Sequence, residues 1–245
     1  MFDAYALWIA LGFLVAATLY ASVGHAGASG YLAVMALAEM APADMKPTAL
    51  VLNVIVSVIG TTTYFRAGCF RWRTLWPFLI GSVPLAFYGS SLPIPPHAFK
   101  VLVGAVLALG AVRLLITVPN AATDTRDAPV SVSVGVGALI GLLSGLTGTG
   151  GGIFLTPILL FLNWSDSRRA AGVSSAFILA NSLAGLAGSG NGIPTVGPAF
   201  PVWALAVVIG GSLGAWLGSR RFAPIVLRRL LAAVLAVAAG KLMLT

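Results

Sequence analysis

Long apolar runs dominate the chain, and polar residues gather in short connections between them. Uncharged or nearly uncharged runs cover residues 46–64, 75–92, 101–112, 130–164 and 202–217. Several of them approach or exceed the roughly 18 residues that a helix needs to cross the hydrocarbon core of a bilayer. Because lipid satisfies no backbone polar group, such runs predict helices. The pattern therefore predicts an all-α integral membrane protein with several spans.

The composition supports this prediction and limits the function. Of the 245 residues, 59% are hydrophobic and 8% are charged, whereas a soluble domain carries roughly a quarter charged residues. The net charge of +8 therefore indicates cytoplasmic membrane flanks and not a nucleic-acid partner. Cys69 is the single cysteine, which excludes an intramolecular disulfide and a CxxC site. The N-terminal run has Asp3 and no basic residue before its apolar part, so we do not expect a cleaved signal peptide.

The two halves of the chain resemble each other. The segments PHAFKVLVGAVLALGAVRLLIT (96–117) and PIVLRRLLAAVLAVAAGKLMLT (224–245) match at a shift of 128 residues, and the same shift joins Asn53 to Asn181. The stretches 80–91 and 210–220 match at a shift near 130. The earlier glycine-rich segments match at a shift of 122, with the pairs Ser22 and Ser144, and Gly30 and Gly152. Internal repeats of this kind are typical of secondary transporters.

This similarity defines the expected domain organisation. Residues 1–117 form a first transmembrane repeat, 118–129 a cytoplasmic linker, and 130–245 a second transmembrane repeat. Each repeat is predicted to contain a glycine-rich re-entrant or broken-helix hairpin followed by three transmembrane helices. Because three spans change the side of the membrane and a hairpin does not, the two repeats are expected to have inverted topology.

The hairpin prediction comes from length and charge. As one helix, residues 130–163 would be roughly 51 Å long, although a bilayer core is about 30 Å thick. If the segment turns back, 11 of the 14 basic residues lie on one side of the membrane, as the positive-inside rule requires. A single crossing would place Arg113 and Arg126 opposite Arg168 and Arg169. We favour re-entrance over two full crossings because each leg would have only about 15 residues.

Glycines in GLTGTGGGIFLTP (145–157) provide the predicted turn. Five of the eight residues 145–152 are glycine, which adopts positive φ without steric cost. The helix after the turn would begin with unpaired N–H groups, and helix N-termini bind anions. Two inverted hairpins would bring two such N-termini together near the midplane. For Gly137, Gly141 and Gly145, whose spacing is small-xxx-small, close helix packing is the simpler explanation.

Polar residues at the turns and within the spans complete the predicted substrate site. Asn53 and Asn181 lie in apolar runs, where an asparagine either bonds a neighbouring helix or marks a solute path. His25 suits proton coupling or pairing with an anion, and a simple bond to a carbonyl is the alternative. The predicted substrate-binding residues are Ser22, His25, Ser29, Gly30, Asn53, Thr147, Thr149, Gly150, Gly151, Gly152 and Asn181. No catalytic residue, metal ligand or cofactor is predicted.

The segments GLLSGLTGTGGGIFLTPILLF and RRAAGVSSAFILANSLAGLAG resemble the sulfite exporter TauE/SafE family of membrane permeases. The resemblance is strongest over 137–190 and extends through the repeat to the whole chain. In the first half, GHAGASG replaces the triple glycine, and no proline stands where Pro157 does in the second half. The resemblance implies transport of a small sulfur-containing anion such as sulfite, a sulfonate or sulfoacetate.

We therefore expect a secondary transporter in the cell inner membrane that moves a small organosulfur anion by alternating access. A passive channel for small anions or polar solutes is the alternative. A membrane enzyme is disfavoured because the spans contain neither paired carboxylates nor a His/Cys or Ser/His/Asp set, and GTGGGI lacks the end of a phosphate loop. The expected partners are the anion and membrane lipid, while a coupling proton or cation and a homodimer stay open.

Overall fold

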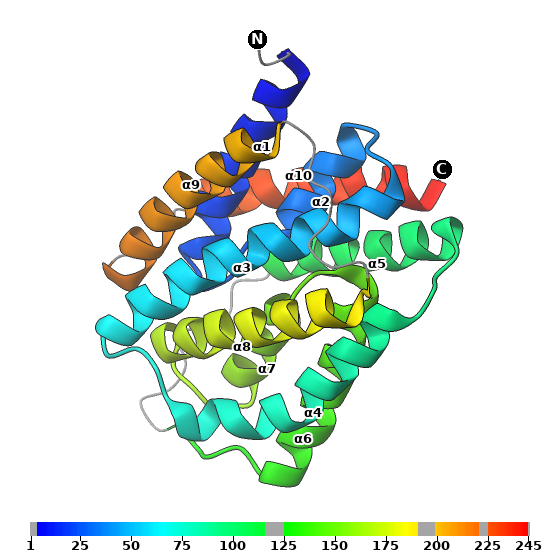
Figure 1. Cartoon of the computed structure of the whole chain (residues 1–245). Coiled ribbons are helices and arrows are strands. Elements are labelled where there is room, and N and C mark those ends of the chain that lie inside the picture. The colour runs from blue at the N-terminus through cyan, green and yellow to red at the C-terminus, as the bar shows by residue number, and fades with distance from the viewer. Residues whose placement is uncertain (1–3, 116–124, 191–198, 221–224, 245) are drawn as a thin grey trace.

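All regular elements in the described part of the chain are α-helices. The computed structural model describes residues 4–115, 125–190, 199–220 and 225–244. Its helices, shown in Figure 1, are α1 (Ala4–Ala21), α2 (Ala28–Leu37), α3 (Pro42–Arg66), α4 (Trp72–Ser91), α5 (Pro96–Leu115), α6 (Val130–Thr147), α7 (Gly152–Phe161), α8 (Ser167–Gly188), α9 (Phe200–Arg220) and α10 (Ile225–Leu244). Residues 118–124 of the predicted linker lie outside the described residues. The all-α prediction is confirmed.

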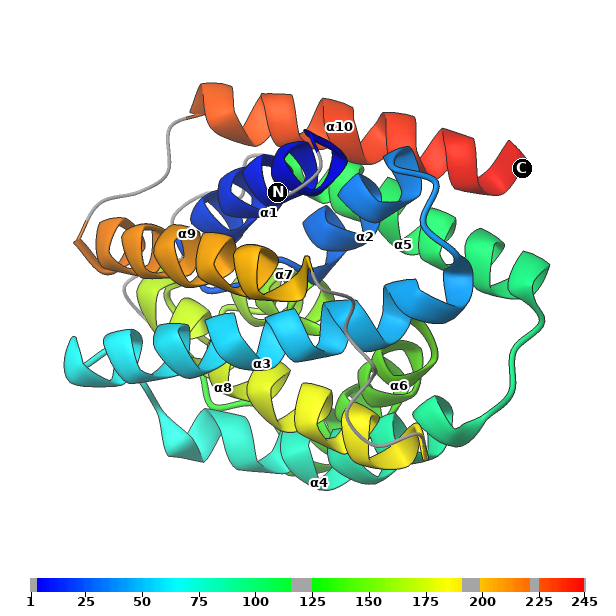
Figure 2. The ribbon, with the colours of Figure 1, turned by 45° about the horizontal axis from the view of Figure 1, so that its top comes forward.

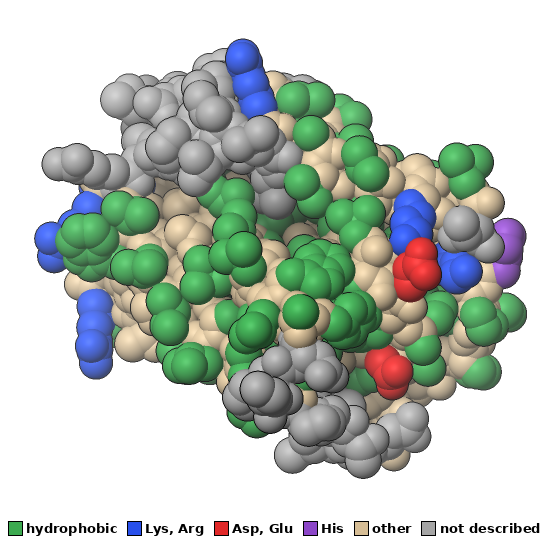
Figure 3. All heavy atoms as spheres, turned by 90° about the horizontal axis from the view of Figure 1, so that it is seen from above, with side chains coloured by type: hydrophobic (Ala, Val, Ile, Leu, Met, Phe, Trp, Pro, Cys, Tyr) green, Lys and Arg blue, Asp and Glu red, His purple; other side chains and the backbone are tan. Residues whose placement is uncertain are grey.

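Five of these helices are long and apolar enough to cross a bilayer, namely α1, α3, α6, α8 and α9. The surface agrees with a lipid environment, because Figure 3 shows a broad apolar face with the Lys and Arg side chains toward its edges. Large side chains such as Leu139 and Leu205 are exposed on the helices. Helices α2 and α7 have 10 residues each, which corresponds to roughly 15 Å, or half of a bilayer core.

Glycines in the left-handed conformation separate the long and the short helix of each pair. Helix α2 begins directly after Gly27 (φ 104°), and α7 begins directly after Gly151 (φ 81°). Gly148 ends α6 with φ 79°, and Gly150 follows with φ 73°. A side chain would be strained at such angles, which explains why glycine occupies these positions. Gly27 and Gly151, which precede the two short helices, lie 124 residues apart. This separation differs by two from the shift of 122 residues at which the sequences of the two hairpins match.

Each pair forms a hairpin whose two ends lie together. We call α1, α2 and their turn hairpin 1, and α6, α7 and their turn hairpin 2. In hairpin 1, the Tyr5 hydroxyl donates to the Ala38 carbonyl at 2.8 Å. In hairpin 2, the Arg126 N–H donates to the Asn163 carbonyl at 2.9 Å. The chain therefore turns back in both places, with legs of 18 and 10 residues and not two legs of about 15.

Polar contacts at the helix ends define two opposite faces. At the arginine-rich face, Asp127 pairs with Arg71 and Arg73, both at 3.3 Å. Arg168 at this face donates to the carbonyl of Arg220, and Asp166 caps α8 by accepting from the Arg168 and Arg169 N–H groups. We call the opposite face the lysine face, after Lys46 and Lys241. There Lys241 pairs with Glu39 at 3.0 Å and Lys46 donates to the Ser90 carbonyl at 3.1 Å. Hairpin 1 starts and ends at the lysine face, and hairpin 2 at the arginine-rich face.

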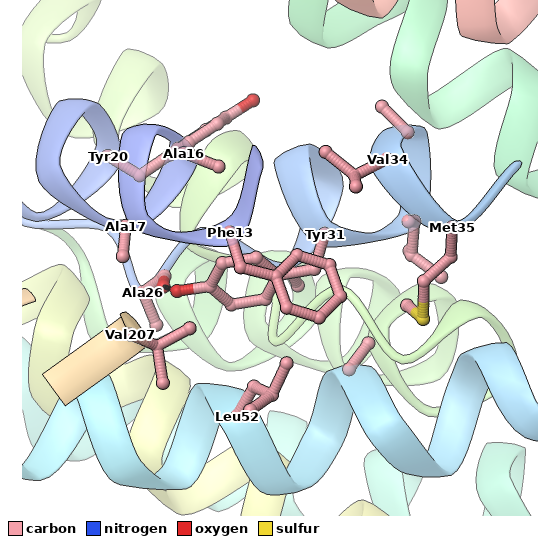
Figure 4. Close-up of a cluster of buried hydrophobic side chains, with 14 of the residues drawn as sticks. Phe13, Ala16, Ala17, Tyr20, Ala26, Tyr31, Val34, Met35, Leu52 and Val207 are labelled. Carbon is pink, nitrogen blue, oxygen red and sulfur yellow. Dashed lines mark hydrogen bonds between the residues drawn. The ribbon is translucent and has the colours of Figure 1, made fainter. Parts of the chain in front are cut away.

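The helices form two apolar cores, and α7 and α8 contribute residues to both. The larger core is built mainly from α1, α2, α3, α5, α9 and α10, and Figure 4 shows Phe13 and Tyr31 packed over Leu52 of α3. The smaller core is built from α4, α6, α7 and α8, with Phe78, Leu155 and Phe177 fully buried. Helices α3 and α8 lie side by side between the two cores (Figures 1 and 2).

Glycines allow backbone contact between two pairs of helices. On α6, a Cβ at Gly137, Gly141 or Gly145 would collide with the backbone of α4 at Phe78, Ser82 or Ala86. On α9, Gly210 and Gly214 make the same approach to the α1 carbonyls of Leu14 and Thr18, and Gly218 approaches the carbonyl of Ser22, directly after α1. Lipid provides little hydrophobic force between helices, so close approach through small residues stabilises membrane bundles. The packing interpretation of Gly137, Gly141 and Gly145 is consistent with these contacts.

Replacing Gly141 with alanine should destabilise the protein, because the new Cβ would meet the Ser82 backbone and force α4 and α6 apart. We expect a loss of about 1–3 kcal/mol in the free energy of unfolding, the usual range for overpacking. Gly135 is the matched control on the same helix, since a Cβ there meets nothing within 4 Å. Thermal unfolding in detergent compares the two variants, and equal midpoints would contradict the packing argument.

Candidate functional site

The turns of the two hairpins meet inside the protein. A Cβ added at Gly152, the first residue of α7, would lie 3.4 Å from the Cδ2 atom of His25 in the turn of hairpin 1. Both residues are buried. The Nδ1 atom of His25 lies 3.1 Å from the Val23 carbonyl, which fixes the ring within its own turn. The turn of hairpin 1 therefore lies beside the N-terminal end of α7.

Asn53 carries the strongest signal of a binding function. Its side chain is fully buried in α3, and neither its amide nitrogen nor its amide oxygen has a hydrogen-bond partner among the described residues. A Cβ at Gly150 would lie 2.8 Å from Asn53 Nδ2 and 3.2 Å from the Ser182 hydroxyl, which is also buried without a partner. Buried polar groups are nearly always satisfied, so a group of unsatisfied ones requires an explanation such as a ligand.

The second turn adds backbone donors to this group. Within the described chain, the N–H groups of Gly150 and Gly151 donate no hydrogen bond, and the first N–H to bond within α7 is that of Phe154, to Gly151. The Gly152 and Ile153 N–H groups thus precede the helical ladder, as at any helix N-terminus. These donors and the partial positive charge of the α7 N-terminus face the turn that Asn53 and Ser182 adjoin. The arrangement suits an anion or a polar oxygen.

The other predicted residues have different surroundings. Asn181 is fully buried on α8 and donates to the Phe177 carbonyl of its own helix, which leaves only its oxygen unsatisfied. Thr147 donates to the Leu143 carbonyl and lies 3.0 Å from the Thr149 hydroxyl. Within hairpin 1, Ser22 donates to the Leu19 carbonyl and Ser29 donates to the Tyr20 hydroxyl. These side chains bond within their own hairpin or helix, unlike the Asn53 amide and the Ser182 hydroxyl.

Gly30 lies in a packing position. A Cβ there would be 2.8 Å from the Ala16 side chain and 3.0 Å from the Tyr20 ring, both on α1. The residue that begins α2 is Ala28, after Gly27. The helix starts Ala28 and Gly152 correspond at a shift of 124 residues, so the shift of 122 aligns Gly30 with Gly152 two residues out of register.

Two residues that the predicted site omits adjoin the second turn. Ser182 follows Asn181 and lies one helical turn after Ile178, whose side chain also touches Gly150. Lys46, at the start of α3, packs its aliphatic chain against Gly148, with Cγ 3.1 Å from the position of an added Cβ. Lys46 is a cation at the start of an apolar span, and this feature of the sequence could have indicated it as a site residue. No feature of the sequence distinguishes Ser182 from neighbouring serines.

Comparison with known proteins identifies the family of the chain. Residues 8–242 match the family described as sulfite exporter TauE/SafE. A Sinorhizobium fredii protein described as a probable membrane transporter protein, y4hK, is 39% identical over 254 aligned positions, which cover 98% of this chain and 99% of the relative. A Xylella fastidiosa probable membrane transporter protein is 36% identical over 91 positions, 36% of this chain and 33% of the relative. No solved structure matches the chain significantly. The chain belongs to the sulfite exporter TauE/SafE family of multi-pass membrane transporters and is not an enzyme.

Proposed function

We propose that the protein is a secondary transporter of the cell inner membrane that moves a small organosulfur anion, such as sulfite, a sulfonate or sulfoacetate, by alternating access. The observation that carries this proposal is the fully buried Asn53, whose amide lies beside the glycine turn at Gly150 and has no hydrogen-bond partner among the described residues. The family description names sulfite export. The remaining predicted residues, including His25 and Asn181, are proposed as neighbours of this site.

Neutral donors suit a transported anion. Oxygens of a sulfite or sulfonate group accept hydrogen bonds, and the charge of the anion strengthens these bonds even when the donors are neutral. The donors available are the Asn53 amide, the Ser182 hydroxyl and the N–H groups at the start of α7. Such a set replaces the water around the anion without holding it as tightly as an arginine would. Transport requires this balance, since the anion must also leave.

The helix contacts support a pair of inverted repeats. If α1–α5 correspond to α6–α10, the contact of α1 with α9 corresponds to that of α6 with α4, and α3 with α9 corresponds to α8 with α4. The glycines take part in this correspondence. Gly81 and Gly89 of α4 approach carbonyls of α6. The glycines 129 residues later, Gly210 and Gly218 of α9, approach carbonyls of α1 and of Ser22 directly after it. Inverted repeats typically surround a site at the midplane.

Counterflow in proteoliposomes tests this function. Vesicles loaded with unlabelled sulfite should accumulate ³⁵S-labelled sulfite transiently above its equilibrium level, because a carrier returns loaded more readily than empty. Vesicles without protein and vesicles with the Asn53→Leu variant serve as controls. Sulfoacetate and taurine in place of internal sulfite identify the preferred anion. Flux without counterflow or saturation would favour a passive channel and contradict alternating access.

A further inference from the structure

A second polar group lies at the lysine-face end of the turn in hairpin 2. Lys46, near the start of α3, donates from Nζ to the Ser90 carbonyl of α4 at 3.1 Å. The Ser90 hydroxyl is buried and has no hydrogen-bond partner among the described residues. We call these two residues the Lys46–Ser90 pair. It combines an ammonium group with an unsatisfied hydroxyl.

No carboxylate of the described residues forms an ion pair with Lys46, whereas Lys241 at the same face pairs with Glu39. Asp44 is exposed, and its position two residues earlier turns it about 200° away round the helix. Lys46 itself is partly buried. Because buried charges are normally paired, a partly buried ammonium without a carboxylate is suited to an external anion.

Capping of α4 accounts for only part of this arrangement. Ser90 lies in the last turn of α4, where carbonyls lack helical partners and a cation is favourable. The bond to its carbonyl uses one of the three donors of the Lys46 ammonium. It leaves the buried hydroxyl of Ser90 unsatisfied, and such groups are uncommon in proteins. A ligand that contacts both the ammonium and the hydroxyl explains the two groups together.

The turn of hairpin 2 links this pair to the site at Asn53. A Cβ at Gly148 would lie 3.1 Å from Lys46 Cγ, and a Cβ at Gly150 would lie 2.8 Å from Asn53 Nδ2. Residues two apart in a chain have Cα atoms separated by at most about 7 Å. The Lys46–Ser90 pair and the Asn53 amide therefore adjoin the two ends of the same short turn.

Leu50 lies between these two polar groups. It follows Lys46 by four residues and precedes Asn53 by three, so the three side chains share one face of α3. Its methyl groups lie 3.2 and 3.4 Å from the position of a Cβ at Gly185 on α8. The Ser90 hydroxyl lies 3.9 Å from the same position. An apolar side chain thus separates the pair from the Asn53 amide.

We propose that Lys46 and Ser90 form a second anion subsite, from which the anion passes Leu50 to reach Asn53. This inference rests on the proposed function and adds a loading step to it. The ligand is a small anion with a sulfite or sulfonate group, one oxygen of which meets the ammonium and another the hydroxyl. The ammonium offsets part of the hydration that the anion loses. The neutral donors beside Asn53 then receive it.

A charge-removing variant tests the subsite. In Lys46→Gln, the sulfite concentration that half-saturates ³⁵S-sulfite counterflow should rise at least about tenfold, the effect of losing a bond between charged groups. The maximal rate should stay within about threefold, because the groups beside Asn53 are unchanged. Lys100→Gln, near the start of α5, removes the same charge and should change neither value more than about twofold. An unchanged half-saturating concentration in Lys46→Gln, or an equal rise in Lys100→Gln, would overturn the proposal.

Chemical restoration of the charge separates a binding role from a structural one. In a Cys69→Ser background, Lys46→Cys alkylated with 2-bromoethylamine carries an ammonium on a thioether chain of lysine length, which sulfite does not cleave. Alkylation with iodoacetamide gives a neutral amide at the same position. Only the ammonium form should return the half-saturating concentration to within about threefold of the unmodified protein. Recovery with both reagents, or with neither, would overturn the proposal.

Thermal unfolding in detergent tests the subsite without transport. At constant ionic strength, sulfite, sulfoacetate and selenite should raise the thermal midpoint, because a ligand that binds the folded state stabilises it. The anion concentration that gives half of the shift should rise at least about tenfold in Lys46→Gln and stay unchanged in Lys100→Gln. Equal concentrations in both variants, or no shift with any anion, would overturn the proposal. A shift that depends on Lys46 without sulfite counterflow would support the subsite and refute the proposed transport function.

Discussion

Replacing Gly150 with alanine is expected to lower anion counterflow at least about 100-fold, the effect that misplacing binding groups by about 1 Å can produce. The added Cβ would lie 2.7 Å from the Ile178 side chain and 2.8 Å from Asn53 Nδ2, so it would displace the amide that we place in the site. The variant is measured in proteoliposomes at matched protein density. The larger Gly150→Val substitution should have at least the same effect.

Gly68 provides a control for backbone strain. Its φ of +70° is close to the +73° of Gly150, but a Cβ at Gly68 meets nothing within 4 Å. Both alanine variants thus carry the cost of a left-handed residue, about 1–2 kcal/mol, and only Gly150→Ala disturbs the turn. We expect Gly68→Ala to transport within about twofold of the unmodified protein. Equal transport by the two variants would show that the space beside Gly150 is not needed.

Replacing Asn53 with leucine should separate stability from transport. The substitution removes two buried polar atoms that have no partner among the described residues. Because an unsatisfied buried group costs roughly 1–3 kcal/mol, the thermal midpoint should stay the same or rise. Counterflow should fall at least about tenfold, because a hydrogen bond to a charged ligand contributes about 1.5–3 kcal/mol.

Thr61→Val is the control for the Asn53 variant. Thr61 lies on the same helix, two turns further along, and its buried hydroxyl also has no partner among the described residues. The substitution should therefore raise or preserve the thermal midpoint without lowering counterflow. If Asn53→Leu lowers the thermal midpoint, Asn53 has a structural role. If Asn53→Leu shows normal counterflow, Asn53 does not take part in transport.

The sequence predicts the hairpins well because their cause is local. Clustered glycines break a helix wherever they lie, and the apolar run over 130–163 is too long for one crossing. The alignment of the first turn with the second does not follow from the local sequence. The shift of 122 residues pairs Gly30 with Gly152, but the short helices begin 124 residues apart, directly after Gly27 and Gly151, so Gly30 lies inside α2 and packs against α1.

The roles of the paired asparagines could not be separated from the sequence. The repeat places Asn53 and Asn181 at corresponding positions, but helix rotation decides what each side chain reaches. Asn181 bonds its own helix, whereas Asn53 faces the turn at Gly150. The sequence also does not predict that α4 of the first half packs in the smaller core and α9 of the second half in the larger core. Membrane helices are apolar toward lipid and toward neighbours alike, so periodicity does not identify their partners.

Anomalous diffraction from crystals grown with selenite tests most directly whether the glycine turns bind the anion. Selenite has the shape and charge of sulfite, and selenium locates it without ambiguity. The account predicts one strong peak between the two turns, within hydrogen-bond distance of the Asn53 amide and the N–H groups of Gly150–Gly152, and its loss in Asn53→Leu. A peak elsewhere, with the Asn53 amide bonded to protein, would contradict it.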